Sequence, residues 1–265
     1  MHRLTREIRF TISPWQSLSA AGNSYCSRPD CDGMGFFFSL WVELGGYLDR
    51  QTGFVVNLTD IDKVCRKNAV PVIDKAVKKC MAQHKDMTIG DLTGMLEGCR
   101  QSIAGDFLPA KVLSVSLKIN PHRKIKILTE EKDMIYYSEK FEFAAMHKLW
   151  NTVLSDEDNF ATFGKCANIT GHGHNYIVEV TIKAPDAQTL KYGGFQRTVI
   201  KNLIELLDHK NLNEDVQYFA AVNPTVENIT TYAWQCLDGR FGGAALHEIT
   251  IWETDRAYCS YRNEE

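Results

Sequence analysis

The chain has 265 residues, a hydrophobic content of 44% and a formal net charge of −3, and this length allows one large domain or two of about 130 residues. The balanced charge argues against a general nucleic-acid-binding protein, and no apolar run approaches the roughly 20 residues of a membrane span. Because the first residues lack the apolar segment of a secretory signal, we expect a cytoplasmic protein whose eight cysteines are reduced thiols.

The first half predicts two strands, two helices and two more strands. One helix begins at Thr59 or Asp60, with Pro71 breaking or restarting it, and a second opens at Thr88. The predicted strands cover 5–13, 36–46, 112–119 and 124–128. In the polar loop 14–34, Cys26 and Cys31 have the spacing of half a zinc site. No second cysteine pair at ligand spacing follows, so we interpret them as loop cysteines.

The second half repeats this order. It begins with a strand, and a loop from Trp150 to Thr170 follows. The next strand ends at Ala184. Two helices come after it, one over 196–207 and another that starts at Asn223-Pro224. The predicted strands cover 137–145, 172–184, 249–254 and 257–262. Corresponding residues recur 133 to 138 positions apart, as in Phe10 and Phe143, Gly35 and Gly173, Thr88 and Thr225, and Val115 and Ile249. A period of this length indicates a duplicated domain.

The segment that points to chemistry is Gly171-His172-Gly173-His174-Asn175-Tyr176, at the start of an alternating strand. Side chains two residues apart on a strand point to the same side, so His172 and His174 project together. Three histidines and one open position form a catalytic zinc arrangement. Two polar residues on a solvated strand face remain the alternative for this short motif on its own.

Other polar motifs surround this pair in the second half. They are His147 just after the strand over 137–145, Cys166 with five residues between it and His172, Asp208-His209, Pro224-Thr225-Val226-Glu227, and Trp252-Glu253-Thr254-Asp255. With these motifs in this order, residues 136–262 resemble the 6-pyruvoyl-tetrahydropterin synthases and their relatives, the 6-carboxytetrahydropterin synthases. The cysteine followed after five residues by His-Gly-His-Asn-Tyr is the most distinctive part of the resemblance.

The resemblance implies a role for each motif in binding or transforming 7,8-dihydroneopterin triphosphate. His147, His172 and His174 would hold one zinc ion per chain, and Cys166 would be the catalytic base. Asp208 and His209 would relay a second proton. Glu253 would anchor the pterin ring, and Thr225 and Glu227 would line the pterin pocket. A carboxylate that faces an amino-pyrimidinone edge accepts two parallel hydrogen bonds.

The implied fold is α+β, with tandem tunnelling-fold (T-fold) repeats, each an antiparallel four-stranded sheet with two helices on one face in the order ββααββ. We predict a degenerate first repeat over 1–130 and a catalytic second repeat over 131–265. Family members form oligomers whose strands join into a barrel, so we expect a homo-oligomer with a small-molecule substrate and without nucleic-acid or membrane partners.

The first half departs from the site pattern. Our alignment places Pro14, Met34 and Phe36 opposite the three histidines, Arg28 opposite Cys166 and Ile119 opposite Glu253. It retains Thr52-Gly53-Phe54-Val55-Val56-Asn57-Leu58-Thr59-Asp60-Ile61, which is similar to a family segment that the second half has lost. We therefore hypothesise one working site per chain, with the first half kept for assembly.

The leading interpretation is a zinc-dependent lyase that eliminates triphosphate and yields 6-pyruvoyl-tetrahydropterin. The five-residue spacing from Cys166 to His172 favours it over 6-carboxytetrahydropterin synthesis, in which the spacing is usually shorter. A cupin-type oxygenase would use His172, His174 and Glu179, but a second motif with a late histidine is missing. A zinc- or pterin-binding scaffold without turnover is a further alternative, against which the complete set of catalytic residue types argues.

Overall fold

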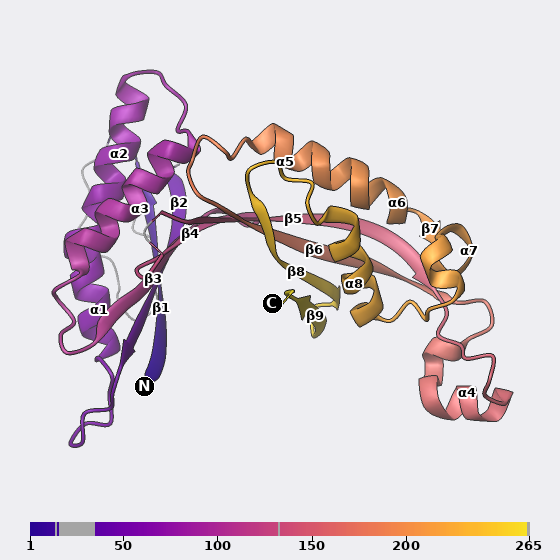
Figure 1. Cartoon of the computed structure of the whole chain (residues 1–265). Coiled ribbons are helices and arrows are strands. Elements are labelled where there is room, and N and C mark those ends of the chain that lie inside the picture. Colours follow the sequence, from indigo (N-terminus) through magenta and orange to yellow (C-terminus); the bar gives the residue numbers. More distant parts are fainter. Residues whose placement is uncertain (14, 16–34, 132, 264–265) are drawn as a thin grey trace. The chain divides into compact units, whose positions relative to one another are not determined.

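The structure is a computed structural model that describes residues 1–13, 15, 35–131 and 133–263. The chain forms two compact units (Figure 1). Unit 1 comprises Met1–Tyr137 with Ala184–Gln188, and unit 2 comprises Ser138–Lys183 with Thr189–Glu265. No helix within the described ranges is both long and apolar enough to cross a membrane. Five residues discussed above lie outside the described residues: Pro14, Cys26, Arg28, Cys31 and Met34.

The described part of unit 1 contains an antiparallel sheet with the order β1-β2-β3-β4. Alternate side chains of a strand point to the same face, and the apolar ones on one face are buried, as with Ile8, Leu40, Val115 and Leu117. The strands are β1 (His2–Ile12), β2 (Phe36–Gly46), β3 (Lys111–Asn120) and β4 (Arg123–Leu128).

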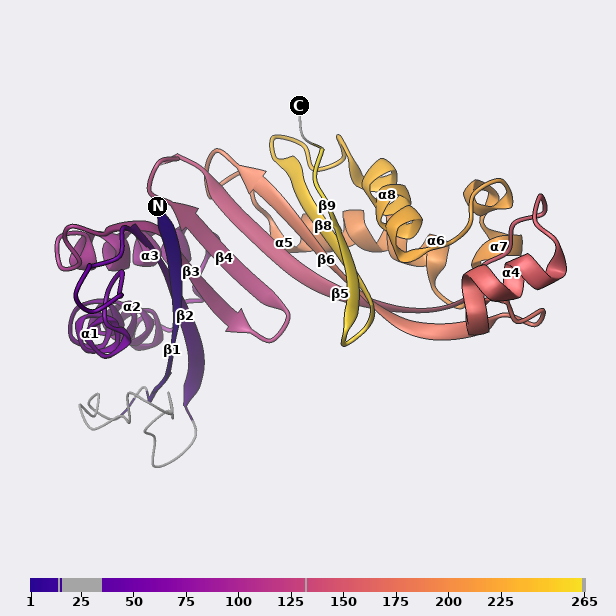
Figure 2. The same cartoon turned by 90° about the horizontal axis from the view of Figure 1, so that it is seen from below.

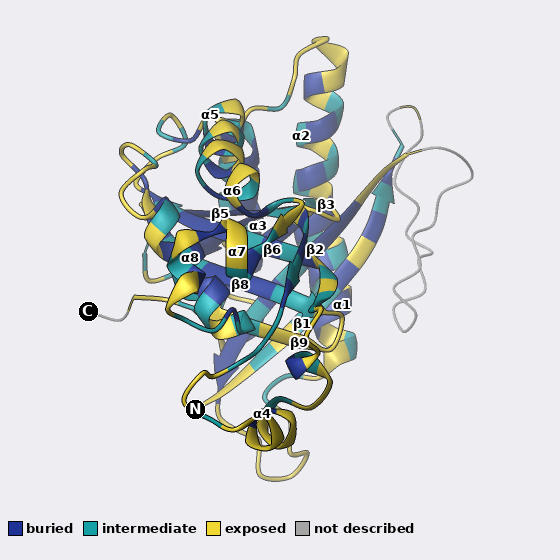
Figure 3. Ribbon diagram, turned by 90° about the vertical axis from the view of Figure 1, so that its right-hand side faces the viewer, coloured by how far each residue is buried: buried dark blue, intermediate teal, exposed yellow. Residues whose placement is uncertain are grey.

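Helices α1 (Leu58–Val64), α2 (Val70–Ala82) and α3 (Ile89–Ile103) lie along one face of this sheet (Figures 1 and 2). Helix α2 is amphipathic, with buried residues recurring every three or four positions between Val70 and Cys80 (Figure 3). A π-helical turn, Cys65–Ala69, joins α1 to α2, and Pro71 is the second residue of α2. Because proline has no N–H to donate and crowds the carbonyl four residues earlier, it restarts the helix at this point.

The two helix starts of unit 1 differ in how well the sequence predicts them. Thr88 caps α3 in a capping box with Asp91, as predicted. The predicted start of α1 at Thr59 or Asp60 is wrong, because Asn57 is the N-cap and its side chain accepts a hydrogen bond from the Thr59 N–H. Asp60 lies instead in the first turn, where its charge suits the helix dipole.

The sheet of unit 2 has the order β5-β6-β8-β9, in which β6, β8 and β9 are antiparallel. Tyr176, Val178 and Val180 on β6, with Ile249 and Ile251 on β8, are fully buried on one face. The strands are β5 (Ile135–His147), β6 (His172–Ala184), β8 (Ala245–Thr254) and β9 (Ala257–Tyr261), and the short β7 (Lys210–Asn211) pairs with β5 in parallel. The expected mixture of helices and antiparallel sheet is therefore confirmed.

The helices of unit 2 correct two predictions. The segment predicted as a loop over 150–170 contains α4 (Asp156–Phe163), which Ser155 caps, and a 3₁₀ turn over Gly164–Ala167. Three acidic residues in the first turn of α4 favour this helix through its dipole. The last helix starts after Thr225, its N-cap, and not at Asn223-Pro224. The other helices are α5 (Tyr192–Val199), which continues through a π turn into α6 (Glu205–Leu207), α7 (Leu212–Asp215) and α8 (Val226–Leu237).

Candidate active site

Three imidazoles converge at one end of the unit 2 sheet. His172 and His174 leave β6 on the same side, and His147 ends the neighbouring strand β5. One ligand nitrogen from each lies within 4.8 Å of the others. The Nε2 atoms of His147 and His172 are 3.2 Å apart, and the centroids of the His172 and His174 rings are 4.7 Å apart. Within the described part of the chain, this is the one group of three or more such ligands.

Backbone contact and burial prepare His147 as a ligand. Its Nδ1 lies 2.6 Å from the Pro224 carbonyl oxygen, and donating a hydrogen bond there leaves the lone pair on Nε2, which faces the other imidazoles. Burial lowers the pKa of His147 and also that of His174. Both rings are therefore held in the neutral form that binds metals.

The donor set fits zinc. Three neutral imidazole nitrogens suit this ion, and a catalytic site keeps one further position open. The buried Nε2 of His174 has no hydrogen-bond partner among the described residues. This nitrogen is therefore available to bind a metal. His147, His172 and His174 would hold the ion.

Glu253 lies beside the imidazoles. In the β6–β8 ladder Ile177 pairs with Trp252, so the next residues, Tyr176 and Glu253, share the opposite face of the sheet, where His174 projects. The Oε1 atom of Glu253 is 3.6 Å from the Nε2 atoms of both His147 and His174.

Cys166 lies in the 3₁₀ turn that precedes β6, and its thiol is free and partly buried. Its carbonyl accepts a hydrogen bond of 2.9 Å from the Leu149 N–H, close in the chain to His147. Burial and then the negative charge of Glu253 raise the pKa of the Cys166 thiol.

Asp208 and His209 form a hydrogen-bonded pair. Asp208 Oδ2 is 2.9 Å from His209 Nδ1, and Asp208 Oδ1 accepts a hydrogen bond of 2.9 Å from the Ala144 N–H. The His209 N–H in turn donates to the Ala144 carbonyl oxygen over 2.6 Å. The Ala144 N–H and then the His209 ring lower the pKa of Asp208. His209 has a positive φ of 57°, an uncommon conformation for a non-glycine residue, and this edge contact with β5 holds it there.

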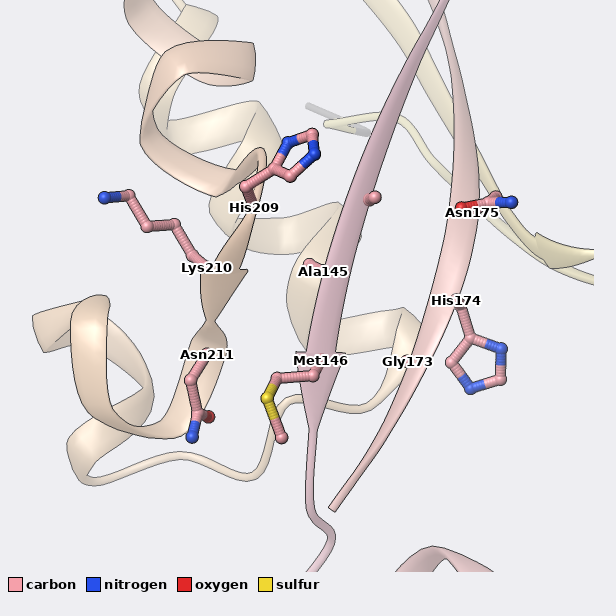
Figure 4. Close-up of a pocket in the computed structure, with 9 residues that line it drawn as sticks. Ala145, Met146, Gly173, His174, Asn175, His209, Lys210 and Asn211 are labelled. Atoms are coloured by element: carbon pink, nitrogen blue, oxygen red, sulfur yellow. The ribbon is translucent and has the colours of Figure 1, made fainter. Parts of the chain in front are cut away.

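This pair does not face the imidazoles of its own chain. The His209 side chain is 82% exposed and lines a groove of about 400 Å³ together with Ala144, Ala145, Met146, Gly173, His174, Asn175, Lys210 and Asn211. In Figure 4, His209 and the His174 imidazole lie on opposite sides of strands β5 and β6, and the His174 ring points away from the groove. The structure thus brings together the three histidines and Glu253, with Cys166 nearby, but not Asp208 and His209.

The segment before α8 contacts the site through its backbone. Thr225 caps α8 and directly follows Pro224, whose carbonyl orients His147. Glu227 is exposed in the first turn of α8, outside the histidine group. Sequence reasoning missed the Pro224 carbonyl, because a backbone acceptor leaves no trace in residue type.

The side chain of Tyr176 also lies beside the histidines. Its ring is fully buried between Phe143 and the imidazoles, and the hydroxyl has no hydrogen-bond partner among the described residues. Burial raises the pKa of this phenol. The period-two alternation that aligns His172 and His174 also covers Tyr176 and was a usable signal.

Known proteins are similar to the second half of the chain. The family model described as 6-pyruvoyl tetrahydropterin synthase matches residues 136–264. The human 6-pyruvoyl tetrahydrobiopterin synthase is 37% identical over 131 residues, which are 48% of this chain and 90% of the relative. A 6-carboxy-5,6,7,8-tetrahydropterin synthase from Aquifex aeolicus is 24% identical over 160 residues, 48% of this chain and 97% of the relative.

A solved structure of the Caenorhabditis elegans 6-pyruvoyl tetrahydropterin synthase is 27% identical, with a TM-score of 0.45, and the alignment covers 49% of this chain and 96% of that one. The family assignment depends on sequence, since the human relative is matched over nine tenths of its length at 37% identity. The chain therefore belongs to the 6-pyruvoyl tetrahydropterin synthase family.

Proposed function

We propose that unit 2 is a zinc-dependent lyase that converts 7,8-dihydroneopterin triphosphate to 6-pyruvoyl-tetrahydropterin with elimination of triphosphate. The observation that carries this proposal is the convergence of His147, His172 and His174 beside Glu253, in a chain whose similar relatives are named 6-pyruvoyl tetrahydrobiopterin synthases.

Each side chain has a role that its surroundings support. Zinc, when bound, would act as a Lewis acid on the side-chain hydroxyls of the substrate. Cys166 would take a proton from the substrate side chain, since its free, partly buried thiol lies in the turn that leads into the strand of His172 and His174. The positive charge of a zinc ion held by the neutral imidazoles would oppose the effect of Glu253 and favour the thiolate. Glu253 would accept hydrogen bonds from the amino-pyrimidinone edge of the pterin.

Asp208 and His209 would relay the second proton, because a carboxylate beside a histidine fixes its tautomer and raises its basicity. In one chain His209 lies across β5 and β6 from the His174 imidazole (Figure 4), and its side chain is open to solvent. We therefore infer that the pair serves the site of a neighbouring chain in a homo-oligomer. Its exposure supports this arrangement, because a relay must contact the substrate directly.

We further propose that the chain is a tandem duplication of T-fold repeats, 1–130 and 131–265, with the working site in the second. The β-bulges support this duplication. In unit 1 the pairing of β2 with β3 shifts between Glu43 and Leu44, and in unit 2 the pairing of β6 with β8 shifts between Thr181 and Ile182, 138 positions later. The partner strands skip Leu113 and His247, 134 positions apart. Bulges are specific features that relatives share.

A polar contact between the first strand of each unit and a later helix, α1 in unit 1 and α5 in unit 2, also recurs. In unit 1 the Arg6 guanidinium makes two hydrogen bonds, of 3.0 and 2.7 Å, to the buried carboxylate of Asp62. In unit 2 the Gln196 amide donates over 2.6 Å to Glu139. Glu139 lies 133 positions after Arg6, and Gln196 lies 134 after Asp62. The position is kept while its chemistry differs, as expected for diverged copies.

The first repeat lacks the ligands in its described part. Phe36 and Ile119, which align with His174 and Glu253, offer neither nitrogen nor carboxylate oxygen to a metal. We therefore propose that the first repeat serves assembly.

Product analysis tests the proposed reaction. Purified protein loaded with zinc is incubated with 7,8-dihydroneopterin triphosphate, and the products are identified by mass spectrometry. We expect a pterin with a pyruvoyl side chain and free triphosphate. A carboxylated pterin with acetaldehyde would support 6-carboxytetrahydropterin synthesis, the activity named in the Aquifex aeolicus relative. Unchanged substrate would reject both and support a binding scaffold.

A further inference from the structure

The candidate site contains a buried hydroxyl to which the proposed reaction gives no role. Tyr176 is fully buried, and its hydroxyl oxygen has no hydrogen-bond partner among the described residues. Buried polar groups in folded proteins are nearly always paired, because an unpaired one costs free energy. A hydroxyl that is kept in this state is therefore a candidate for direct contact with a bound molecule.

Strand pairing places Tyr176 among the groups of the site. It follows His174 by two residues on β6, so both side chains lie on the same face of the sheet, and their ring centroids are 5.5 Å apart. The β6–β8 register, continued by one residue, sets Tyr176 opposite Glu253. Side chains that face each other on antiparallel strands have Cβ atoms about 4.5–5.5 Å apart. Tyr176 thus lies between the histidines and this carboxylate.

Packing fixes the orientation of the phenol ring. The Phe143 ring stacks on it, with centroids 4.9 Å apart and an interplanar angle of 12°. The His147 ring lies at 90° to it, with centroids 6.3 Å apart. A side chain that its neighbours already hold in place loses little further freedom when it binds a ligand. The hydroxyl is therefore preorganised for a hydrogen bond.

The hydroxyl is a hydrogen-bond donor at neutral pH. The pKa of a phenol is about 10 in water, and burial, followed by the negative charges of Glu253 and Cys166, raises the pKa of Tyr176. The group stays protonated and neutral, so it can donate to an oxygen without adding a charge to the site.

We propose that the Tyr176 hydroxyl donates a hydrogen bond to the oxygen of the substrate side chain that is attached next to the pterin ring. The inference rests on the proposed function, in which Glu253 holds the ring and the histidine site holds the side chain. Tyr176 lies between these two groups, where the ring and the side chain would join.

The proposed reaction changes the chemistry of this oxygen. It starts as a hydroxyl and ends as a carbonyl oxygen of the pyruvoyl group, which can only accept hydrogen bonds. A fixed donor favours the state in which the carbonyl forms over the bound substrate. The hydrogen bond should therefore raise kcat more than it lowers KM.

Tyr176→Phe removes the hydroxyl and keeps the ring. The kcat should fall by about 100-fold, a loss typical of one preorganised donor, and the zinc content should match that of the wild type. Because the hydroxyl has no partner among the described residues, the urea midpoint of unfolding should stay the same or rise. Tyr137→Phe is the matched control and should keep kcat, since Tyr137 is also fully buried but lies near the start of β5, at the opposite end from His147.

Equilibrium binding identifies the part of the substrate that Tyr176 contacts. Isothermal titration calorimetry measures the dissociation constants of 7,8-dihydroneopterin, which carries the side-chain hydroxyls, and of 7,8-dihydropterin, which has no side chain. Tyr176→Phe should weaken the binding of dihydroneopterin by about threefold to tenfold, the value of one neutral hydrogen bond. The binding of dihydropterin should not change.

The outcomes separate this inference from the proposed function. Unchanged kcat in Tyr176→Phe, an equal loss of affinity for both pterins, or a lower urea midpoint would overturn the role of Tyr176, while the proposed reaction stands. If the wild-type protein neither binds these pterins nor converts 7,8-dihydroneopterin triphosphate, the proposed function fails, and this inference fails with it.

Discussion

At the scale of single residues, the candidate site depends on groups that fix the protonation of its functional side chains. The Pro224 carbonyl selects the tautomer of His147, and burial keeps that ring neutral. The Ala144 N–H and the His209 ring favour the ionised form of Asp208, because their hydrogen bonds lower its pKa. Asp208 therefore stays ionised throughout the neutral range.

Replacing the proposed base tests its role directly. Cys166→Ala should lower kcat by about 10²–10⁴-fold, the contribution typical of a general base, and should leave the zinc content unchanged, because the three imidazoles remain. Turnover assays and metal analysis measure the two effects. Cys236→Ala is the matched control, since Cys236 is a partly buried cysteine on α8. Full activity in Cys166→Ala would remove Cys166 from the mechanism.

Asp208→Asn separates the two contacts of that carboxylate. The amide oxygen can still accept from the Ala144 N–H, while the amide nitrogen would face His209 Nδ1 and favour the other tautomer. We expect a fall in kcat of about 10²-fold or more with little change in KM. Steady-state kinetics measure this, and unfolding in urea should match that of the wild type. A variant with unaltered kcat would show that the pair relays no proton.

At the scale of elements, strand alternation delivers the histidines, and this part was readable from the sequence. The pattern His172-Gly173-His174 on β6 predicts two imidazoles on one side, and the structure places them there. The position of Asp208-His209 was not readable, because it depends on the contact of β7 with β5 and on the positive φ of His209. Neither the strand contact nor the backbone conformation of His209 produces a periodic pattern in the sequence. Helix α4 was missed because its signal, Ser155 followed by three acids, lies within a short polar segment.

The caps of α3 and α8 give a matched pair of substitutions. Thr88 and Thr225 occupy corresponding positions of the two proposed repeats, and each accepts a hydrogen bond from the N–H three residues later. Thr88→Ala and Thr225→Ala should each cost about 1 kcal/mol of unfolding free energy, measured in urea. Thr225→Ala alone should weaken zinc binding, because it loosens the segment whose Pro224 carbonyl orients His147. Equal zinc affinity in the two variants would contradict this link.

At the scale of the whole molecule, the proposed site needs more than one chain. If the Asp208–His209 pair serves a neighbour, two inactive variants should complement each other. Cys166→Ala keeps the pair, and His209→Ala keeps the thiol. Mixed oligomers, isolated with two different affinity tags, should contain intact sites and show activity far above either variant alone. Mixed oligomers that are as inactive as the separate variants would place the pair and the thiol in one chain.

We propose a single metal site per chain, in unit 2. The most direct measurement is the mass of the intact protein in native mass spectrometry, combined with metal analysis after exhaustive exchange into metal-free buffer. We predict one zinc ion per chain, lost in His172→Ala and in His174→Ala. Two zinc ions per chain, or one that persists in both variants, would contradict the account.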